Sequence, residues 1–263
     1  MFQPRVFFRP FHRHRAGINM NVIARFASLL LLAGCGISAA HAGTQIVGTR
    51  VVYGAADRDV SVRILNTGDS PRLLQAWVDD GDERQTAETS KAPFLVTPPV
   101  SRVEPGKGQS LRLMFTGAPL PQDRESVFWL NVVEVPPKPE VKEGESANHL
   151  QFAVRTRINI FYRPTALPGD PKSSIDTLAW RLVGSNGKMA LECTNNSAFN
   201  VSFADVRLKG APDKKNDATG GGMCPAKGTA TFDVHGGSES GRLTFQSIDD
   251  YGAFRDGEAA YTR

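Results

Sequence analysis

The sequence predicts an all-β protein built from two β-sandwiches joined by a short linker. Short apolar runs follow one another from Thr44 onward, separated by turn residues at the spacing of antiparallel sandwiches. No stretch carries the pattern of a long amphipathic helix. The 263 residues suffice for two ordinary domains, and the segment 165–171 (TALPGDP) breaks the strand pattern as a linker would.

Residues 1–42 are predicted to be a secretory signal peptide that is cleaved from the mature chain. They hold five arginines and no acidic residue, and the apolar run 26–32 is too short to span a bilayer. Residues 40–42 (AHA) supply the small-x-small cleavage pattern, and Met20 is an alternative start. The sequence LAGC ending at Cys35 leaves a second interpretation, a lipidated N-terminus. In both interpretations the folded part is exported.

The mature chain is expected to be nearly neutral. Removing the five leader arginines from the 31 basic residues leaves 26, against 27 acidic residues, a net charge of −1. This balance gives no electrostatic reason to expect binding to nucleic acid.

The first domain is predicted to span residues 43–166. The segment 127–135 (VFWLNVVEV) is its most apolar run and is expected to be a central strand. The polar, proline-bearing segment 136–149 is expected to be a loop between two strands. The strands expected in this domain are Thr49–Tyr53, Val60–Ile64, Leu73–Val78, Phe94–Val96, Leu111–Phe115, Val127–Val135 and Leu150–Arg163.

The strand that begins at Leu150 has two possible uses. Leu150, Phe152 and Val154 alternate with Gln151, Ala153 and Arg155, which is the period of a strand whose side chains point to opposite faces. Such a strand can bury one face in its own domain and also offer apolar side chains to another chain. Pro164 cannot donate a ladder hydrogen bond and is expected to end the strand.

The second domain is predicted to span residues 167–263. Its expected strands are Leu178–Leu182, Lys188–Cys193, Asn200–Leu208, Thr229–Val234, Leu243–Ile248 and Glu258–Thr262. Cys193 and Cys224 remain as an even pair if Cys35 is removed, so export to an oxidising compartment favours a disulfide between them. Two buried free thiols are the alternative.

The sequence offers no sign of an active site. Three of the five histidines lie in the leader, and the other two, His149 and His235, are isolated, which excludes a zinc cluster of the usual spacing. No nucleophile, phosphate-binding or dinucleotide motif is present. The carboxylate pairs Asp79/Asp80 and Asp249/Asp250 stand at strand ends, where turn formation explains them. We therefore expect no catalytic residue, metal, cofactor or small-molecule substrate; an exported hydrolase is a remote alternative.

A set of short motifs, taken in order, resembles the periplasmic pilus-assembly chaperones of the chaperone–usher pathway. The stretches that carry the resemblance are 49–51 (TRV), 75–77 (QAW), 97–99 (TPP), 102–106 (RVEPG), 120–126 (LPQDRES), 131–137 (NVVEVPP), 161–164 (FYRP), 199–203 (FNVSF) and 248–252 (IDDYG). They cover nearly the whole mature chain, and their order and spacing make the resemblance specific.

The resemblance implies a fold of two immunoglobulin-like sandwiches set at an angle, and a role in the periplasm. Members of this family bind pilus subunits by donor-strand complementation, in which the chaperone lends a strand to a subunit whose own core lies open. They then deliver the subunit to an outer-membrane usher. A two-domain immunoglobulin-like surface adhesion or structural protein is the competing interpretation of the same strand pattern.

The resemblance also implies roles for particular residues. Leu150, Phe152 and Val154 match the alternating donor residues that fill pockets in the subunit. Arg50 matches the arginine that binds the C-terminal carboxylate of the subunit, and a guanidinium can donate two charge-assisted hydrogen bonds to a carboxylate.

At Asn159 the sequence departs from the family, which places a lysine there as a second carboxylate ligand. Asparagine donates a hydrogen bond but brings no charge. Arg155 and Arg157 share a strand face with Asn159 and are candidates to replace the missing charge.

The resemblance further implies a charge network between the two domains, formed by Glu134, Arg163 and Asp250. The alternative is three unrelated surface charges, each pair of which stabilises the fold by about 0–1 kcal/mol.

Overall fold

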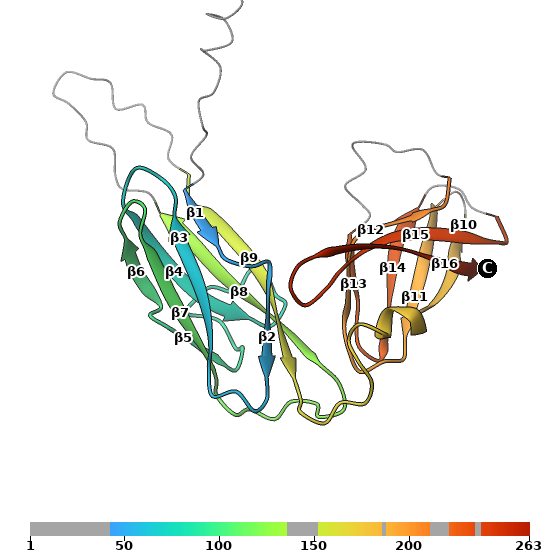
Figure 1. Cartoon of the computed structure of the whole chain (residues 1–263), viewed down its shortest axis with the longest axis horizontal. Coiled ribbons are helices and arrows are strands. Elements are labelled where there is room, and N and C mark those ends of the chain that lie inside the picture. Colours follow the sequence, from blue (N-terminus) through green and yellow to red (C-terminus); the bar gives the residue numbers. More distant parts are fainter. Residues whose placement is uncertain (1–42, 136–151, 186–187, 211–220, 235–237) are drawn as a thin grey trace, which may run out of the picture. The chain divides into compact units, whose positions relative to one another are not determined.

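The computed structural model describes residues 43–135, 152–185, 188–210, 221–234 and 238–263. Apart from the short 3₁₀ helix η1 (Ser174–Thr177), the regular structure of these residues is β-strand (Figure 1). Strands β1 to β9 belong to the first domain and β10 to β16 to the second. The predicted all-β fold is confirmed. Cys35 and Leu150 lie outside the described residues.

The first domain is a sandwich of a four-stranded and a five-stranded sheet. The four-stranded sheet has the order β1 (Thr44–Ile46), β3 (Val60–Asn66), β7 (Gly108–Phe115) and β5 (Phe94–Thr97). The five-stranded sheet has the order β2 (Arg50–Gly54), β9 (Val154–Arg163), β8 (Ser126–Val135), β4 (Arg72–Asp79) and β6 (Val100–Val103). Figure 1 shows β9, in yellow, between β2, in blue, and β8, in green.

The core of this sandwich comes from the period-two pattern of its strands. On β8 and β9, Leu130 and Ile160 are completely buried, and their neighbours two positions away face the same side. The inner face of the five-stranded sheet is formed by Leu74, Ala76, Val78, Phe128, Leu130, Val132, Ile158 and Ile160, which pack against Ile64, Leu111 and Leu113 of the other sheet. The odd-numbered residues of β9 therefore lie on the outer face.

The seven strands of the second domain form one continuous sheet that folds back on itself. The order is β13 (Gly222–Cys224), β12 (Val201–Leu208), β15 (Ser240–Ile248), β16 (Phe254–Thr262), β10 (Ala179–Ser185), β11 (Lys188–Asn195) and β14 (Gly228–Val234), and the two end strands contact each other. Its core contains three mutually packed aromatic rings, those of Trp180, Phe203 and Phe232, and Phe245 packs against Phe203.

The predicted disulfide between Cys193 and Cys224 is confirmed, and it joins β11 to β13. Both cysteines are completely buried within the core of the second domain. By closing a loop across 31 positions, the bond lowers the entropy of the unfolded chain and stabilises the domain by roughly 3–4 kcal/mol in the chain-entropy model.

Candidate functional site

The first half of β9 has one unpaired edge among the residues that the structure describes. β8 pairs with β9 from Val154 to Tyr162, whereas β2 pairs with it, in parallel, from Asn159 to Arg163. Residues 154–158 therefore have a strand on one side alone. Their remaining backbone N–H and C=O groups form an edge to which another strand can add.

Two large apolar side chains stand uncovered at this edge. Phe152 is 68% exposed and Val154 is 55% exposed. By parity they lie on the same side of the chain as Ile158 and Ile160, which are buried in the core. The row of side chains that fills the core of the first domain thus continues past the end of the sandwich, and within the described residues nothing covers it.

Arg50 begins β2 at the point where the open edge ends. It stands opposite Asn159 in the β2–β9 ladder. Its Nη1 donates a hydrogen bond to the carbonyl oxygen of Ile248 at 3.0 Å, while its Nε is buried without a partner. Burial lowers the pKa of Arg50, and the charges of Asp250 and Asp249 partly offset this shift. An arginine stays protonated under such conditions, so this is a partly desolvated cation.

A pocket of about 410 Å³ lies beside Arg50. The first domain contributes Arg50, Glu125 and Phe161; the second contributes the segment that includes Lys172 and Ile175, and the turn between β15 and β16, with Asp249, Asp250 and Tyr251. Asn159 is not among the lining residues. The pocket combines apolar walls with charged groups of both signs.

Arg157 is bound elsewhere on the sheet and does not supply the missing charge. Its Nε and Nη2 donate to the two carboxylate oxygens of Asp79 at 2.9 and 2.6 Å, and its guanidinium lies 4.4 Å from the ring centre of Trp129. Its Nη1 donates to Glu83 at 3.1 Å.

Arg155 is occupied in the same way. Its Nε and Nη2 donate to Oδ1 of Asn131 at 2.9 and 2.6 Å, and its guanidinium lies 4.9 Å from the ring centre of Trp77. Neither arginine lines the pocket beside Arg50, and both guanidiniums belong to a cluster around Asp79 and Asn131.

Asp79 is the centre of this cluster, and the sequence interpretation of it as a turn residue was incomplete. Its carboxylate is completely buried, and it accepts hydrogen bonds from Arg157, from Asn131 at 2.7 Å and from the backbone N–H of Gly81 at 2.8 Å. Burial alone would raise the pKa of Asp79, but the hydrogen bonds from Arg157, Asn131 and Gly81 outweigh it and hold the pKa below its usual value.

The charge network between the domains forms with one change of member. Arg163 donates through Nη1 and Nη2 to Asp250 at 2.8 and 3.0 Å, and through Nε to Glu125 at 2.6 Å. Glu125 also accepts from the backbone N–H of Asn200 at 2.8 Å. The family resemblance assigns Glu134 to this network. In the structure the carboxylate that binds Arg163 from the first domain is Glu125.

The register of β8 against β9 explains this correction. Ser126 pairs with Tyr162, which places residue 125 beside Arg163, whereas Glu134 pairs with Val154 at the other end of the strands. At ~3.3 Å per residue, that end lies roughly 30 Å from Arg163. Glu134 instead pairs with Arg72 at 3.3 Å. Glu125 lies within the motif 120–126, which is one of the stretches that carry the family resemblance.

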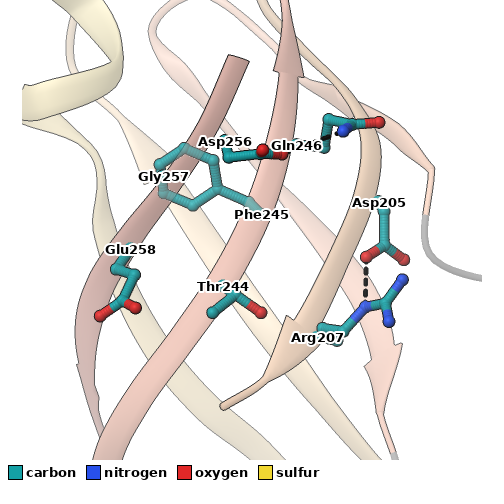
Figure 2. A pocket seen from close by; sticks show the side chains of 8 residues that line it. All are labelled: Asp205, Arg207, Thr244, Phe245, Gln246, Asp256, Gly257 and Glu258. Atoms are coloured by element: carbon teal, nitrogen blue, oxygen red, sulfur yellow. Dashed lines mark hydrogen bonds and ion pairs between the residues drawn. The ribbon is translucent and has the colours of Figure 1, made fainter. Parts of the chain in front are cut away.

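A second hollow, of about 460 Å³, lies on the surface of β12, β15 and β16 (Figure 2). Its carboxylates already have partners: Asp205 pairs with Arg207, Asp256 accepts from Gln246 at 2.9 Å, and Glu258 accepts from Lys209 and Arg242. Within the described ranges, no group of three or more metal-binding side chains occurs. The pocket beside Arg50, with its unpartnered buried donor, is the stronger candidate site.

No helix in the described part of the chain is long and apolar enough to cross a membrane.

Two family models match the chain. Residues 43–168 match the pili and flagellar-assembly chaperone model, PapD N-terminal domain. Residues 173–259 match the pili assembly chaperone PapD model, C-terminal domain. Together the matches span nearly all of residues 43–263.

Named relatives agree with these models. The probable fimbrial chaperone YadV of Escherichia coli is 39% identical over 225 residues, which are 84% of this chain and 91% of YadV. The chaperone protein FimB/FhaD of Bordetella pertussis is 37% identical over 252 residues, 94% of this chain and 97% of the relative. In the solved complex of the Salmonella enterica SafB chaperone with the SafA pilin, one chain aligns with a TM-score of 0.69 at 26% identity, covering 84% of this chain and 96% of that chain. The chain therefore belongs to the family of PapD-like pilus assembly chaperones, which are not enzymes.

Proposed function

We propose that this chaperone binds pilus subunits by lending them the first half of β9, and delivers them to an outer-membrane usher. The observation that carries the proposal is the uncovered pair Phe152 and Val154 on a strand edge that leads directly to Arg50. Leu150 is the third proposed donor residue and lies outside the described residues. No specific observation favours the alternative of a surface adhesion protein.

The geometry predicts the direction in which the subunit strand runs. β2 begins at Arg50 and runs parallel to β9, so it occupies the same edge that is open at residues 154–158. A subunit strand on that open edge, with its C-terminal carboxylate at Arg50, must continue the line of β2. It therefore runs parallel to β9, with backbone hydrogen bonds along the edge and donor side chains filling its core.

An Arg50→Ala variant tests the carboxylate contact. Losing a charge-assisted hydrogen bond to a carboxylate is expected to weaken subunit binding roughly 10–100-fold. Co-expression with a pilus subunit encoded beside the chaperone gene measures this as loss of subunit from the periplasm and from the purified complex.

The matched control is Arg102→Ala, which removes an exposed arginine of the same domain paired with Glu104. Near-UV circular dichroism checks that Arg50→Ala remains folded, since the substitution also removes the hydrogen bond to Ile248. Normal subunit levels with folded Arg50→Ala would contradict the proposal.

The proposed site of action is the periplasm, after cleavage of the leader behind Ala42. The expected mature N-terminus is Gly43, and Cys35→Ser is expected to leave export and the N-terminus unchanged. Intact-mass measurement of protein released by osmotic shock checks both. A membrane-bound, acylated form beginning at Cys35 would instead support the lipoprotein interpretation.

A further inference from the structure

The pocket beside Arg50 is lined by two further cationic residues, Arg255, which pairs with Asp249, and Lys172. Lys172 lies at the start of the second domain, shortly before η1, and is exposed to solvent. Its backbone N–H donates to Asp170 at 2.9 Å, but among the described residues its Nζ makes neither a hydrogen bond nor an ion pair. Its charge is therefore available to a ligand in the pocket.

The carboxylates that line the same pocket already accept hydrogen bonds, Asp170 among them through one oxygen from the backbone N–H of Lys172. Both oxygens of Asp250 accept from Arg163, and both oxygens of Glu125 accept from Arg163 and Asn200. Asp249 accepts from Arg255 and from two backbone N–H groups. Nζ of Lys172 and the buried Nε of Arg50 are therefore cationic donors without a partner among the residues lining the pocket.

We infer that Lys172 and Arg50 together form a two-cation site for the C-terminal carboxylate of the bound subunit, an inference that rests on the proposed function. A carboxylate has two oxygens with about four acceptor positions, so it can accept from Arg50, whose Nη1 already donates to Ile248, and from a second cation at the same time. Lys172 offers three donors on a flexible stem from the other domain. The subunit end then contacts both domains of the chaperone at once.

The walls of the pocket strengthen such a contact. Phe161 is buried and lines the pocket beside Arg50, which lowers the local dielectric around the guanidinium. A charge-assisted hydrogen bond in such a setting is expected to change binding about tenfold or more. Lys172 is therefore expected to contribute to affinity for the free carboxylate and little to affinity for the rest of the subunit strand.

A pair of synthetic peptides separates these two contributions. The probe is a soluble peptide of alternating valine and threonine with a lysine-rich N-terminal tail, prepared with a free C-terminal carboxylate and as the C-terminal amide. Fluorescence anisotropy gives the dissociation constants of both for the whole chaperone, and their ratio is the preference for the carboxylate. Lys172→Met is compared with Lys172→Arg, which keeps the charge, and with Lys91→Met, which removes an exposed lysine outside the pocket.

The inference predicts that Lys172→Met lowers the carboxylate preference about tenfold, while Lys172→Arg and Lys91→Met keep it. Arg50→Ala is expected to lower it at least as far. An unchanged preference in Lys172→Met, together with a lost preference in Arg50→Ala, would overturn the role of Lys172 and leave the proposed function standing. Equal affinity of the wild-type protein for the two peptides, or no binding of either, would overturn both.

Discussion

A Phe152→Asp variant is expected to accumulate as a folded, disulfide-bonded protein that retains no pilus subunit. Phe152 is 68% exposed in the free chaperone, so aspartate there costs the chaperone little stability. In the complex the same position would enter the apolar groove of the subunit, where an unpaired carboxylate is desolvated at a cost of several kcal/mol. That cost corresponds to a loss of affinity of more than about 100-fold. Co-purification of a co-expressed subunit measures the effect.

Leu95→Asp is the matched control for this substitution. Leu95 is 57% exposed on β5, an end strand of the other sheet, so the same chemical change is made at similar exposure away from the open edge of β9. Subunit yield with Leu95→Asp should equal that of the wild type, and Phe152→Leu should retain most of it. Undiminished co-purification with Phe152→Asp, or an equal loss with Leu95→Asp, would count against β9 as the donor strand.

The sequence predicted those parts of the fold in which one face of a strand is buried. The apolar run 127–135 predicted a central strand, and β8 is the middle strand of the five-stranded sheet, with Leu130 completely buried. The short strands β6 and β13 were not predicted, since neither has enough residues to show a period. The sequence pattern also did not specify the register between β8 and β9. This register places Glu125, and not Glu134, beside Arg163.

The arginines of β9 also show that a strand pattern does not predict which side chains meet across a sheet. Parity correctly placed Arg155 and Arg157 on the face of Asn159, but it says nothing about what stands opposite on the other strands. The partner of Arg157 is Asp79, which reaches it from β4 across the intervening strand β8. Such a partner follows from the order of strands in the sheet, and that order is a property of the whole fold.

This cross-sheet pair leads to the second large expected effect, on stability. Asp79→Ala leaves the partly buried guanidinium of Arg157 without its two carboxylate bonds and removes the acceptor of Asn131. Breaking one partner of a buried ion pair is expected to lower the free energy of unfolding of the first domain by about 3 kcal/mol. Urea unfolding at neutral pH, followed by the fluorescence of Trp77 and Trp129 beside the two arginines, measures the loss. The matched control is Glu104→Ala, which breaks an exposed ion pair with Arg102 and should lower the free energy of unfolding by about 0–1 kcal/mol.

The same carboxylate predicts a dependence of stability on pH. Because the pKa of Asp79 is lower in the folded chain than in the unfolded one, its contribution is fully present above the unfolded value of about 3.9 and is lost as the pH falls through the folded value. Below about pH 4 the wild type should therefore lose stability more steeply than Asp79→Ala, and the gap between them should narrow. A gap that stays constant from pH 7 into this range would show that Asp79 stabilises the sheet by packing and not by its charge.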